Sequence, residues 1–343
     1  MSSIKNNRIL SNTKDFVGKN RKIFYCLLIV FLFAVPYAGL SDFILRIIVT
    51  SLIYSIANLG NMVIVGYCGL LTCGHGAFYG LGAYVSALLA VKLGLSFPMC
   101  FLCAILGSML FGFLIALPCL RVDVDFLSLI TIAFAQIFNA VVKNWTPVTG
   151  GARGVVGIPV PEIFGITINT QKEFYILVMI IAIIVYVLLK NLMNSSVGRA
   201  MMAVRDDEIG AKAMGIDVNK YKIIAFVVGS TVAGIGGSLI AHYLRYIGPT
   251  SFTLDLSLLF TQMIILGGLG SLEGAIVGAF FFTVMPEIFR PLAVFRMGIG
   301  GLVMLLVILI RPQGLLGSKA FAGKGGVLTE LINKRRKARK AEQ

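Results

Sequence analysis

The chain has 343 residues, of which 58% are aliphatic, aromatic or cysteine and only 13% are charged. A soluble domain of this length needs more charged residues than this to cover its surface. The composition therefore excludes a soluble globular protein. The net charge of +15 does not require a nucleic-acid partner, because basic residues in the cytoplasmic loops of a membrane protein, close to anionic membrane lipid, give the same excess.

Apolar runs predict an all-α polytopic membrane protein with about ten transmembrane helices. A helix needs about 20 apolar residues to cross a hydrocarbon core of roughly 30 Å. The runs that approach this length are residues 23–40, 43–65, 69–91, 97–119, 126–144, 174–192, 222–243, 255–270, 272–289 and 297–310. The third, eighth and ninth are rich in glycine, which predicts short, kinked or broken helices there.

Basic residues predict the orientation of these helices. Six lie in residues 1–22, six in residues 190–222 and nine in the tail from Arg311, and Arg121 adds one more. Ten alternating spans place all of them on one side, so we expect both termini in the cytoplasm. The first run is too long for a cleaved signal peptide and is interpreted as a retained anchor. The predicted organisation is a basic tail at 1–22, a transmembrane domain at 23–318 and a basic tail at 319–343.

Glycines and one histidine mark the segment at 69–90, GLLTCGHGAFYGLGAYVSALLA. Gly76 and Gly80 have the four-residue spacing that favours close helix crossings. His75 is an ionisable residue within an apolar run, and such residues usually face a protein interior or a wet path. We therefore expect Gly74 and His75 near a pore or at a helix end.

Two amide side chains lie well inside the apolar run at 126–144. Gln136 and Asn139 are three positions apart in an apolar run, where they either face a polar substrate or join neighbouring helices. The sequence leaves both interpretations open.

The segment at 145–173 is rich in glycine, proline and threonine and is too short to fold as a domain, so it is expected to cap an outer vestibule.

A polar island at 193–221 separates two apolar runs. Its apolar residues recur at helical spacing, and charged residues occupy the other positions. This pattern predicts one short cytoplasmic helix that either fills a groove on another protein or rests on the membrane surface. Gly215 is expected to end it in a left-handed turn. The predicted apolar face consists of Met201, Val204, Ile209, Ala213 and Met214.

No pattern for catalysis, nucleotide binding or metal binding is present in the sequence. His75 and His242 are far apart, and the glycine-rich segments lack the lysine and hydroxyl residues that hold a triphosphate. Cys100 and Cys103 form CxxC, but no second pair completes a zinc set. We therefore expect a protein that is not an enzyme and needs no cofactor, with any ATP hydrolysed on partner subunits.

Six separate segments carry the most specific signal. GLLTCGHGAFYGLGAY at 69–84 is similar to GxxSLGHAAFxGxGAY, and TGGARGVVGIP at 149–159 is similar to TGGxxGIxGIP. The remaining four are FLSLITIAFAQI, VGRAMMAVRDDEIGAKAMGIDVNKYKIIAF, GGLGSLEGAIVGA and RPQGLLG. Together, over roughly residues 45–318, they resemble the LivM-type permease subunits of bacterial branched-chain amino acid ABC importers.

The resemblance implies a helical permease in the bacterial inner membrane. Its partners would be a second, homologous permease, two cytoplasmic ATPases and an extracytoplasmic substrate-binding protein. The polar island would be the coupling helix that docks on an ATPase, with this role falling on Arg205, Asp206, Asp207, Glu208, Ala213 and Gly215. The substrate path is expected at Gly74, His75, Gln136, Asn139, Thr149, Gly150, Gly151 and Arg153.

Three departures from the family pattern keep other substrates open. Gln136 stands where the family often has glutamate, Arg153 stands where it often has an amide, and VDVD at 122–125 replaces a more usual turn. If these positions influence specificity, a urea or short-amide permease is the alternative to a branched-chain amino acid permease. An ion-coupled secondary transporter is an alternative of another class, but it needs mid-membrane polar sites and few carboxylates lie there.

Overall fold

The computed structural model describes residues 33, 35–37, 39, 41–122, 124–163, 165–288, 301–302, 304–307, 309 and 314–317. Two compact units divide within helix α3, after Arg46. In the first unit, the described residues include a short 3-10 helix, η1 (Val35–Tyr37), and the beginning of α3 (Asp42–Asn61). The second unit begins at Ile47 and contains all the features that follow.

The described part of the second unit is mostly helical. From α3 the chain passes directly into a π-helix, η2 (Met62–Tyr67). The later helices are α4 (His75–Leu93), α5 (Phe97–Cys119), α6 (Val124–Asn144), α7 (Thr146–Thr149), η3 (Gly151–Arg153), α8 (Gln171–Asn194), α9 (Ser196–Asp206), α10 (Glu208–Ala213), α11 (Val218–Leu244), η4 (Pro249–Ser251), α12 (Leu254–Gly267) and α13 (Leu272–Ile288). Two antiparallel strand pairs are small: β1 (Val155–Val156) with β4 (Tyr246–Ile247), and β2 (Glu162–Ile163) with β3 (Ile166–Thr167).

Seven helices in the described part are long and apolar enough to cross a membrane. They confirm the expectation of a helical, multi-pass membrane protein. They are Asp42–Tyr67, His75–Leu93, Phe97–Cys119, Phe126–Asn144, Gln171–Asn194, Val218–Leu244 and Pro249–Gly267. Helix α13, at 17 residues, matches the ninth predicted run. The predicted run at 23–40 lies largely outside the described residues, as does most of the run at 297–310.

One predicted boundary is wrong. The third run was expected to be helical from residue 69, but α4 begins only at His75. Gly69 has a positive φ of 75°, a left-handed conformation that turns the chain out of the preceding helix. The glycine-rich stretch before His75 is therefore a turn.

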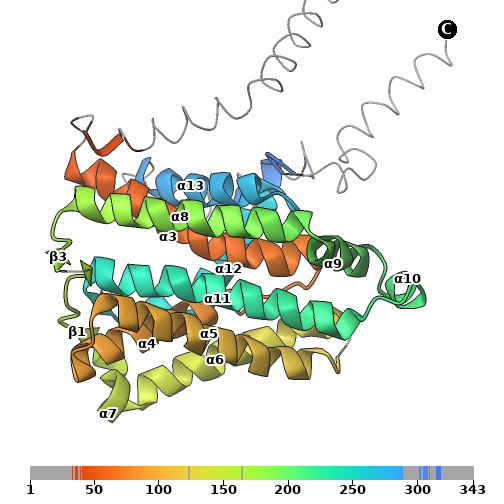
Figure 1. The fold of residues 1–343 in the computed structure, drawn as a ribbon, viewed down its shortest axis with the longest axis horizontal. Coiled ribbons are helices and arrows are strands. Elements are labelled where there is room, and N and C mark those ends of the chain that lie inside the picture. The colour runs from red at the N-terminus through yellow and green to blue at the C-terminus, as the bar shows by residue number, and fades with distance from the viewer. Residues whose placement is uncertain are drawn as a thin grey trace, which may run out of the picture. The chain divides into compact units, whose positions relative to one another are not determined.

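The long helices run between two ends of the second unit (Figure 1). Helices α9 and α10 lie at one end, called here the α10 end. Helix α7 and strands β1 and β3 lie at the opposite end, called here the loop end. The two segments with the most distinctive sequences, 193–221 and 145–173, thus lie at opposite ends.

Glycines bring α11 into backbone contact with α4. A Cβ on Gly82 would overlap the backbone of Gly234, and a Cβ on Gly237 would overlap the carbonyl oxygen of Tyr79. Helix α5 packs on the same helix, where Gly112 meets Ser230. This is the close crossing that the small residues of the 69–90 segment predict, although its tightest point is Gly237 of α11 against Tyr79.

Helices α12 and α13 form a second close pair, in which Gly267 meets the backbone of Gly274. Residues 314–317 return to the end of α12. There the backbone N–H of Leu315 donates to Leu266 O at 2.9 Å, and that of Leu316 donates to Gly267 O at 2.8 Å. Glu273, in the first turn of α13, pairs with Lys190 of α8 at 3.3 Å.

Candidate functional site

The polar island forms two helices rather than the single helix expected from its periodicity. Asp207 has extended backbone angles (φ −159°, ψ 108°) and separates α9 from α10. Its carboxylate accepts hydrogen bonds from the backbone N–H groups of Ile209 and Gly210, both at 3.0 Å. Asp207 is therefore the N-cap of a new helix, a role for which aspartate is among the preferred residues.

The predicted left-handed turn at Gly215 is confirmed, with φ of 80°. The N–H of Gly215 donates to Lys212 O and that of Ile216 donates to Ala211 O, both at 3.0 Å. This pair of bonds is a Schellman motif, which satisfies the last carbonyl groups of a helix. Helix α10 is thus closed at both ends and forms a defined projection.

The predicted apolar face is wrong, because the break at Asp207 changes the direction of the chain. Met201 and Val204 are buried within this protein, where α9 packs against η2, α8 and α11. Ala213 is exposed. Ile209 on α10 and Met214 at its C-cap are 82% and 83% exposed, so the most exposed large apolar side chains of the island lie at α10.

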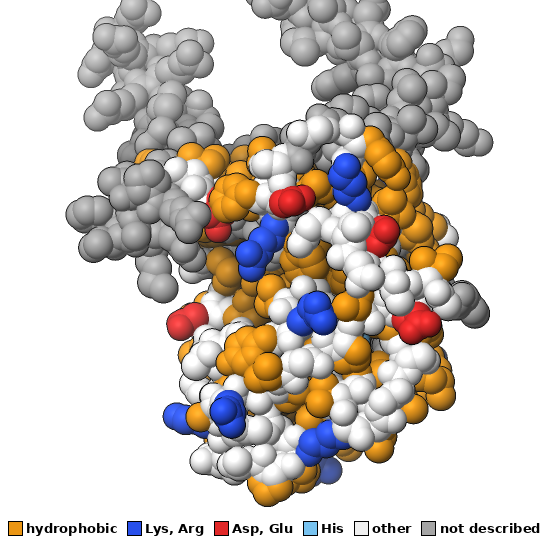
Figure 2. Space-filling view, turned by 90° about the vertical axis from the view of Figure 1, so that its left-hand side faces the viewer, with side chains coloured by type: hydrophobic (Ala, Val, Ile, Leu, Met, Phe, Trp, Pro, Cys, Tyr) orange, Lys and Arg blue, Asp and Glu red, His pale blue; other side chains and the backbone are white. Residues whose placement is uncertain are grey.

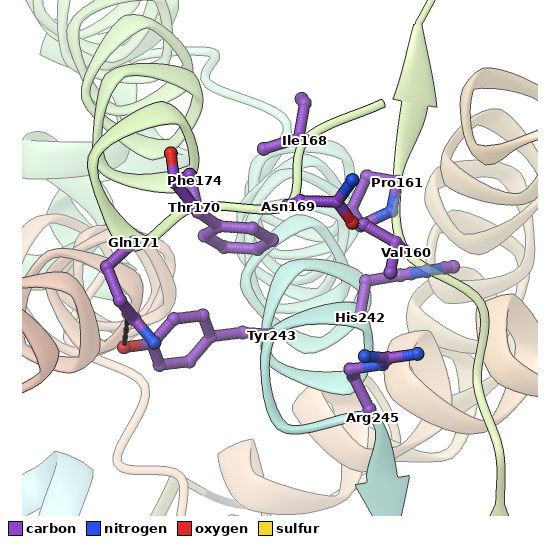
Figure 3. A pocket seen from close by; sticks show the side chains of 10 residues that line it. All are labelled: Val160, Pro161, Ile168, Asn169, Thr170, Gln171, Phe174, His242, Tyr243 and Arg245. Atoms are coloured by element: carbon purple, nitrogen blue, oxygen red, sulfur yellow. Dashed lines mark hydrogen bonds between the residues drawn. The ribbon is translucent and has the colours of Figure 1, made fainter. Parts of the chain in front are cut away.

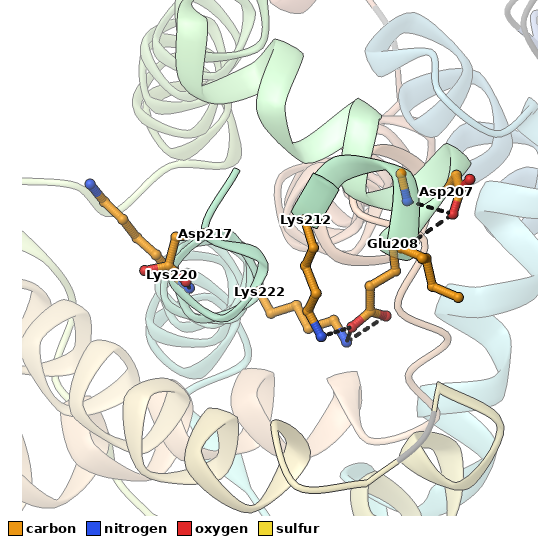
Figure 4. A network of polar contacts seen from close by, with 8 residues as sticks. Asp207, Glu208, Lys212, Asp217, Lys220 and Lys222 are labelled. Carbon is orange, nitrogen blue, oxygen red and sulfur yellow. Dashed lines mark hydrogen bonds and ion pairs between the residues drawn. The ribbon is translucent and has the colours of Figure 1, made fainter. Parts of the chain in front are cut away.

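The charged residues of the island also divide into two groups. The guanidinium of Arg205, only 9% exposed, donates from Nη1 to Gly66 O at 3.1 Å and pairs with Asp206 at 2.7 Å. Glu208 faces Lys212 and Lys222 (Figure 4). Asp206 and Asp207 are exposed. Arg205 and Glu208, which were expected to meet an ATPase, are thus engaged within the chain.

An open hollow of about 530 Å³ lies beside α10. Its walls come from the segment directly after α5, from α10 and its N-cap, and from the beginning of α11. The lining residues are Leu120, Arg121, Val122, Asp207, Glu208, Ile209, Lys212 and Lys222. The α10 end therefore offers a projecting apolar pair next to a polar, hollowed surface.

Gly74 and His75 form part of the protein interior. Gly74 precedes α4, and a Cβ there would overlap the backbone of Thr131 in α6. His75 is the first residue of α4 and is fully buried, with Nε2 2.8 Å from Ala57 O and its ring edge-on to Phe260. His75 therefore stands at a helix end, as expected, and its ring lies in the protein interior.

Gln136 and Asn139 have different surroundings on α6. The amide of Asn139 donates to Pro249 O at 2.7 Å, so this residue joins α6 to the segment before α12. Gln136 is exposed, and it lies at helical spacing from the exposed residues Leu129, Ala133 and Ala140. An amide on an otherwise apolar exposed face is unfavourable against lipid.

The predicted outer-loop residues shape a turn. Thr149 is buried, and its hydroxyl donates to Val142 O at 2.6 Å. Gly150 and Gly151 have positive φ angles of 76° and 60°, which favour glycine. Arg153 is exposed at the loop end. Figure 2 looks onto this end, where basic and acidic side chains lie among polar and apolar ones.

A small pocket of about 200 Å³ also lies at the loop end, and the sequence did not predict it (Figure 3). His242, in the last turn of α11, is buried, with Nδ1 3.1 Å from Pro159 O and Nε2 3.0 Å from Ser86 Oγ. None of the predicted path residues lines this pocket. Its walls are Val160, Pro161, Ile168, Asn169, Thr170, Gln171, Phe174, His242, Tyr243 and Arg245.

The apolar helices of the described residues define a polytopic membrane protein. Residues 43–311 match the family described as "Branched-chain amino acid transport system / permease component". The chain belongs to this family. It is accordingly a transport subunit and not an enzyme.

Three relatives illustrate this membership. The LivM permease protein of the high-affinity branched-chain amino acid transport system of Escherichia coli K12 is 32% identical over 319 residues, covering 86% of this chain and 75% of the relative. A probable LivM from Methanocaldococcus jannaschii is 26% identical, covering 67% and 70%. LivH from Salmonella typhimurium is 24% identical, covering 77% and 91%. No solved structure matches the chain.

Proposed function

We propose that this chain is the LivM-type permease subunit of an ATP-driven importer of branched-chain amino acids in a bacterial inner membrane. It forms the translocation path with a second, homologous permease, receives substrate from an extracytoplasmic binding protein and is coupled to two cytoplasmic ATPases. The observation that carries the proposal is the capped helix α10, which projects Ile209 and Met214 from the end of the bundle.

Exposed apolar side chains on such a helix favour a protein partner. Burial of an isoleucine or methionine side chain stabilises a complex by about 1.5–3 kcal/mol. The exposed Asp206 and Asp207 next to them supply charges that can fix the register of docking. The coupling role expected for Ala213 and Gly215 fits this view, because Ala213 is exposed on α10 and Gly215 closes it.

The reconstituted importer tests this function directly. Proteoliposomes with both permeases, the ATPases and the binding protein should accumulate leucine, isoleucine or valine only when ATP is supplied. A ligand screen on the binding protein separates these substrates from urea and short amides. Uptake driven by an ion gradient without ATP would instead favour a secondary transporter and contradict the proposal.

The proposed topology has ten spans and both termini in the cytoplasm, so that the α10 end faces the cytoplasm and the loop end faces outward. Cysteines introduced at Ser196 and at Glu330, the latter outside the described residues, should react only with a cytoplasmic label. A cysteine at Val156, an exposed residue of β1, should react only from outside. Val156 is preferred to the buried Thr149.

Background labelling at Cys68 should be weak, because burial raises the pKa of its thiol to about 12 and keeps it protonated. A split between the labels at Ser196 and Glu330 would contradict the ten-span topology.

Gln136 and Arg153 are the predicted path residues whose exposure suits contact with substrate or a partner. We propose that the α6 face around Gln136 lies toward the path and the second permease, because an amide there avoids lipid. Gly74, His75, Asn139, Thr149, Gly150 and Gly151 then shape the walls through packing.

Arg153→Ala should lower substrate uptake several-fold while the importer still assembles. Arg153 is an exposed cation on the 3-10 turn η3, where it can meet a substrate carboxylate or the binding protein. The measurement is initial uptake rate against substrate concentration, with Lys172→Ala, another exposed cation of the loop end, as control. Unchanged kinetics would remove Arg153 from the path.

A further inference from the structure

Glu208 ties α10 to the transmembrane helix α11. The ammonium group of Lys222 donates to both carboxylate oxygens of Glu208, at 2.8 and 2.9 Å (Figure 4). Glu208 is the first residue of α10, and Lys222 lies near the beginning of α11. The ion pair therefore connects the projecting helix to the following span without passing through the turn between them.

The Lys222 side chain is only 7% exposed, so its ammonium group has little contact with water and Glu208 is its ion-pair partner. Among the described residues, Glu208 is the only carboxylate within ion-pair distance of Lys222. Lys212 also reaches Glu208, but its nitrogen is 3.9 Å away and its side chain is 61% exposed. An exposed pair of that kind contributes little. The Glu208–Lys222 pair is partly buried, with the Glu208 side chain 32% exposed, and removing Glu208 would leave the buried Lys222 ammonium without this partner.

The position of the pair suits the transmission of movement. Ile209 follows Glu208 directly, so a partner that displaces the exposed Ile209 side chain acts on the residue next to the ion pair. On the other side of Glu208, the extended backbone of Asp207 interrupts the helix, so α9 does not continue rigidly into α10. Helix α11 in turn packs on α4 through the backbone contact at Gly82, and on α5 where Gly112 meets the Ser230 side chain.

We propose that Glu208 and Lys222 form an internal strut that carries movement of α10 into α11, and that Glu208 is a positioning residue rather than an ATPase contact. The inference rests on the proposed function, since it assumes an ATPase that moves α10. It differs from the role that family resemblance assigns to Glu208, which is direct docking.

The test uses the complete importer in proteoliposomes and compares variants by uptake per ATP hydrolysed and by co-purification of the ATPases. Glu208→Gln and Lys222→Met should each keep the ATPases bound but lower uptake per ATP by at least about tenfold. The exchange Glu208→Lys with Lys222→Glu restores an ion pair and should recover most of the coupling. Lys212→Gln is the control and should behave like the unmodified importer.

The neutral double variant, Glu208→Gln with Lys222→Met, separates a strut from a purely stabilising pair. It leaves no unpaired buried charge, so the permease should fold and assemble, yet uptake per ATP should stay low. Full coupling in this variant would overturn the proposal, and so would failure of the exchanged pair to recover coupling. Loss of the ATPases in Glu208→Gln but not in Lys222→Met would show that Glu208 docks. An unmodified chain that captures no ATPase would overturn the proposed function itself.

Discussion

Aspartate in place of Ile209 should abolish substrate uptake while the permease still folds and inserts in the membrane. The side chain is 82% exposed, so a carboxylate there remains in water when the chain is alone. In the importer proposed above, the ATPase would cover this position, and a buried unpaired charge costs several kcal/mol. Co-purification of the ATPase should therefore fall by roughly two orders of magnitude.

The matched control is Ile166→Asp, since Ile166 is 70% exposed at the loop end. This variant should retain the ATPase fully. Ala213→Asp should act like Ile209→Asp, and Gly215→Val should act through the backbone, because valine resists the positive φ at that position. Normal uptake and normal co-purification in Ile209→Asp would show that α10 does not transmit the energy of ATP hydrolysis.

Gly237→Leu should prevent stable folding of the permease. Any Cβ at this position overlaps the carbonyl oxygen of Tyr79, and the contact is with backbone, which cannot move aside by changing a rotamer. Overpacking of this kind costs about 3 kcal/mol or more. The variant should accumulate at a low level and elute as aggregate from size-exclusion chromatography in mild detergent, whereas the unmodified protein gives one symmetric peak.

Gly107→Ala provides the comparison within the neighbouring helix α5. The nearest atom to an added Cβ there is Val85 Cγ2 at 3.5 Å, an ordinary contact. This variant should elute and transport like the unmodified protein. If Gly237→Leu matched it, the tight crossing of α4 and α11 would not be a requirement of the fold.

Much of the helical architecture follows from the sequence, since long apolar runs have one stable form in a membrane. The runs at 97–119 and 126–144 agree closely with the helices Phe97–Cys119 and Phe126–Asn144. Hydropathy did not reveal the π-helix at Met62–Tyr67, because an apolar run has the same composition whether its hydrogen bonds follow the α or the π pattern. Backbone geometry of this kind depends on which surfaces pack together.

The sequence predicted where the candidate site lies in the chain, but not its internal structure. The aspartate at 207 is a recognisable N-cap signal, and reading it as one would have divided the island into two helices. The partners of Arg205 and Glu208 were not predictable in the same way. Gly66 and Lys222 are brought to them by tertiary packing, and helical periodicity carries no information about such contacts.

The contact of residues 314–317 with α12 bears on how the protein is made. The carbonyl groups of Leu266 and Gly267 belong to the last turn of their helix, which has no partners of its own for them. Their donors, Leu315 and Leu316, leave the ribosome only after α13 and the apolar run that follows it have been synthesised. The end of α12 therefore reaches its final hydrogen bonding late in synthesis, and until then water or other groups have to pair with these two carbonyl groups.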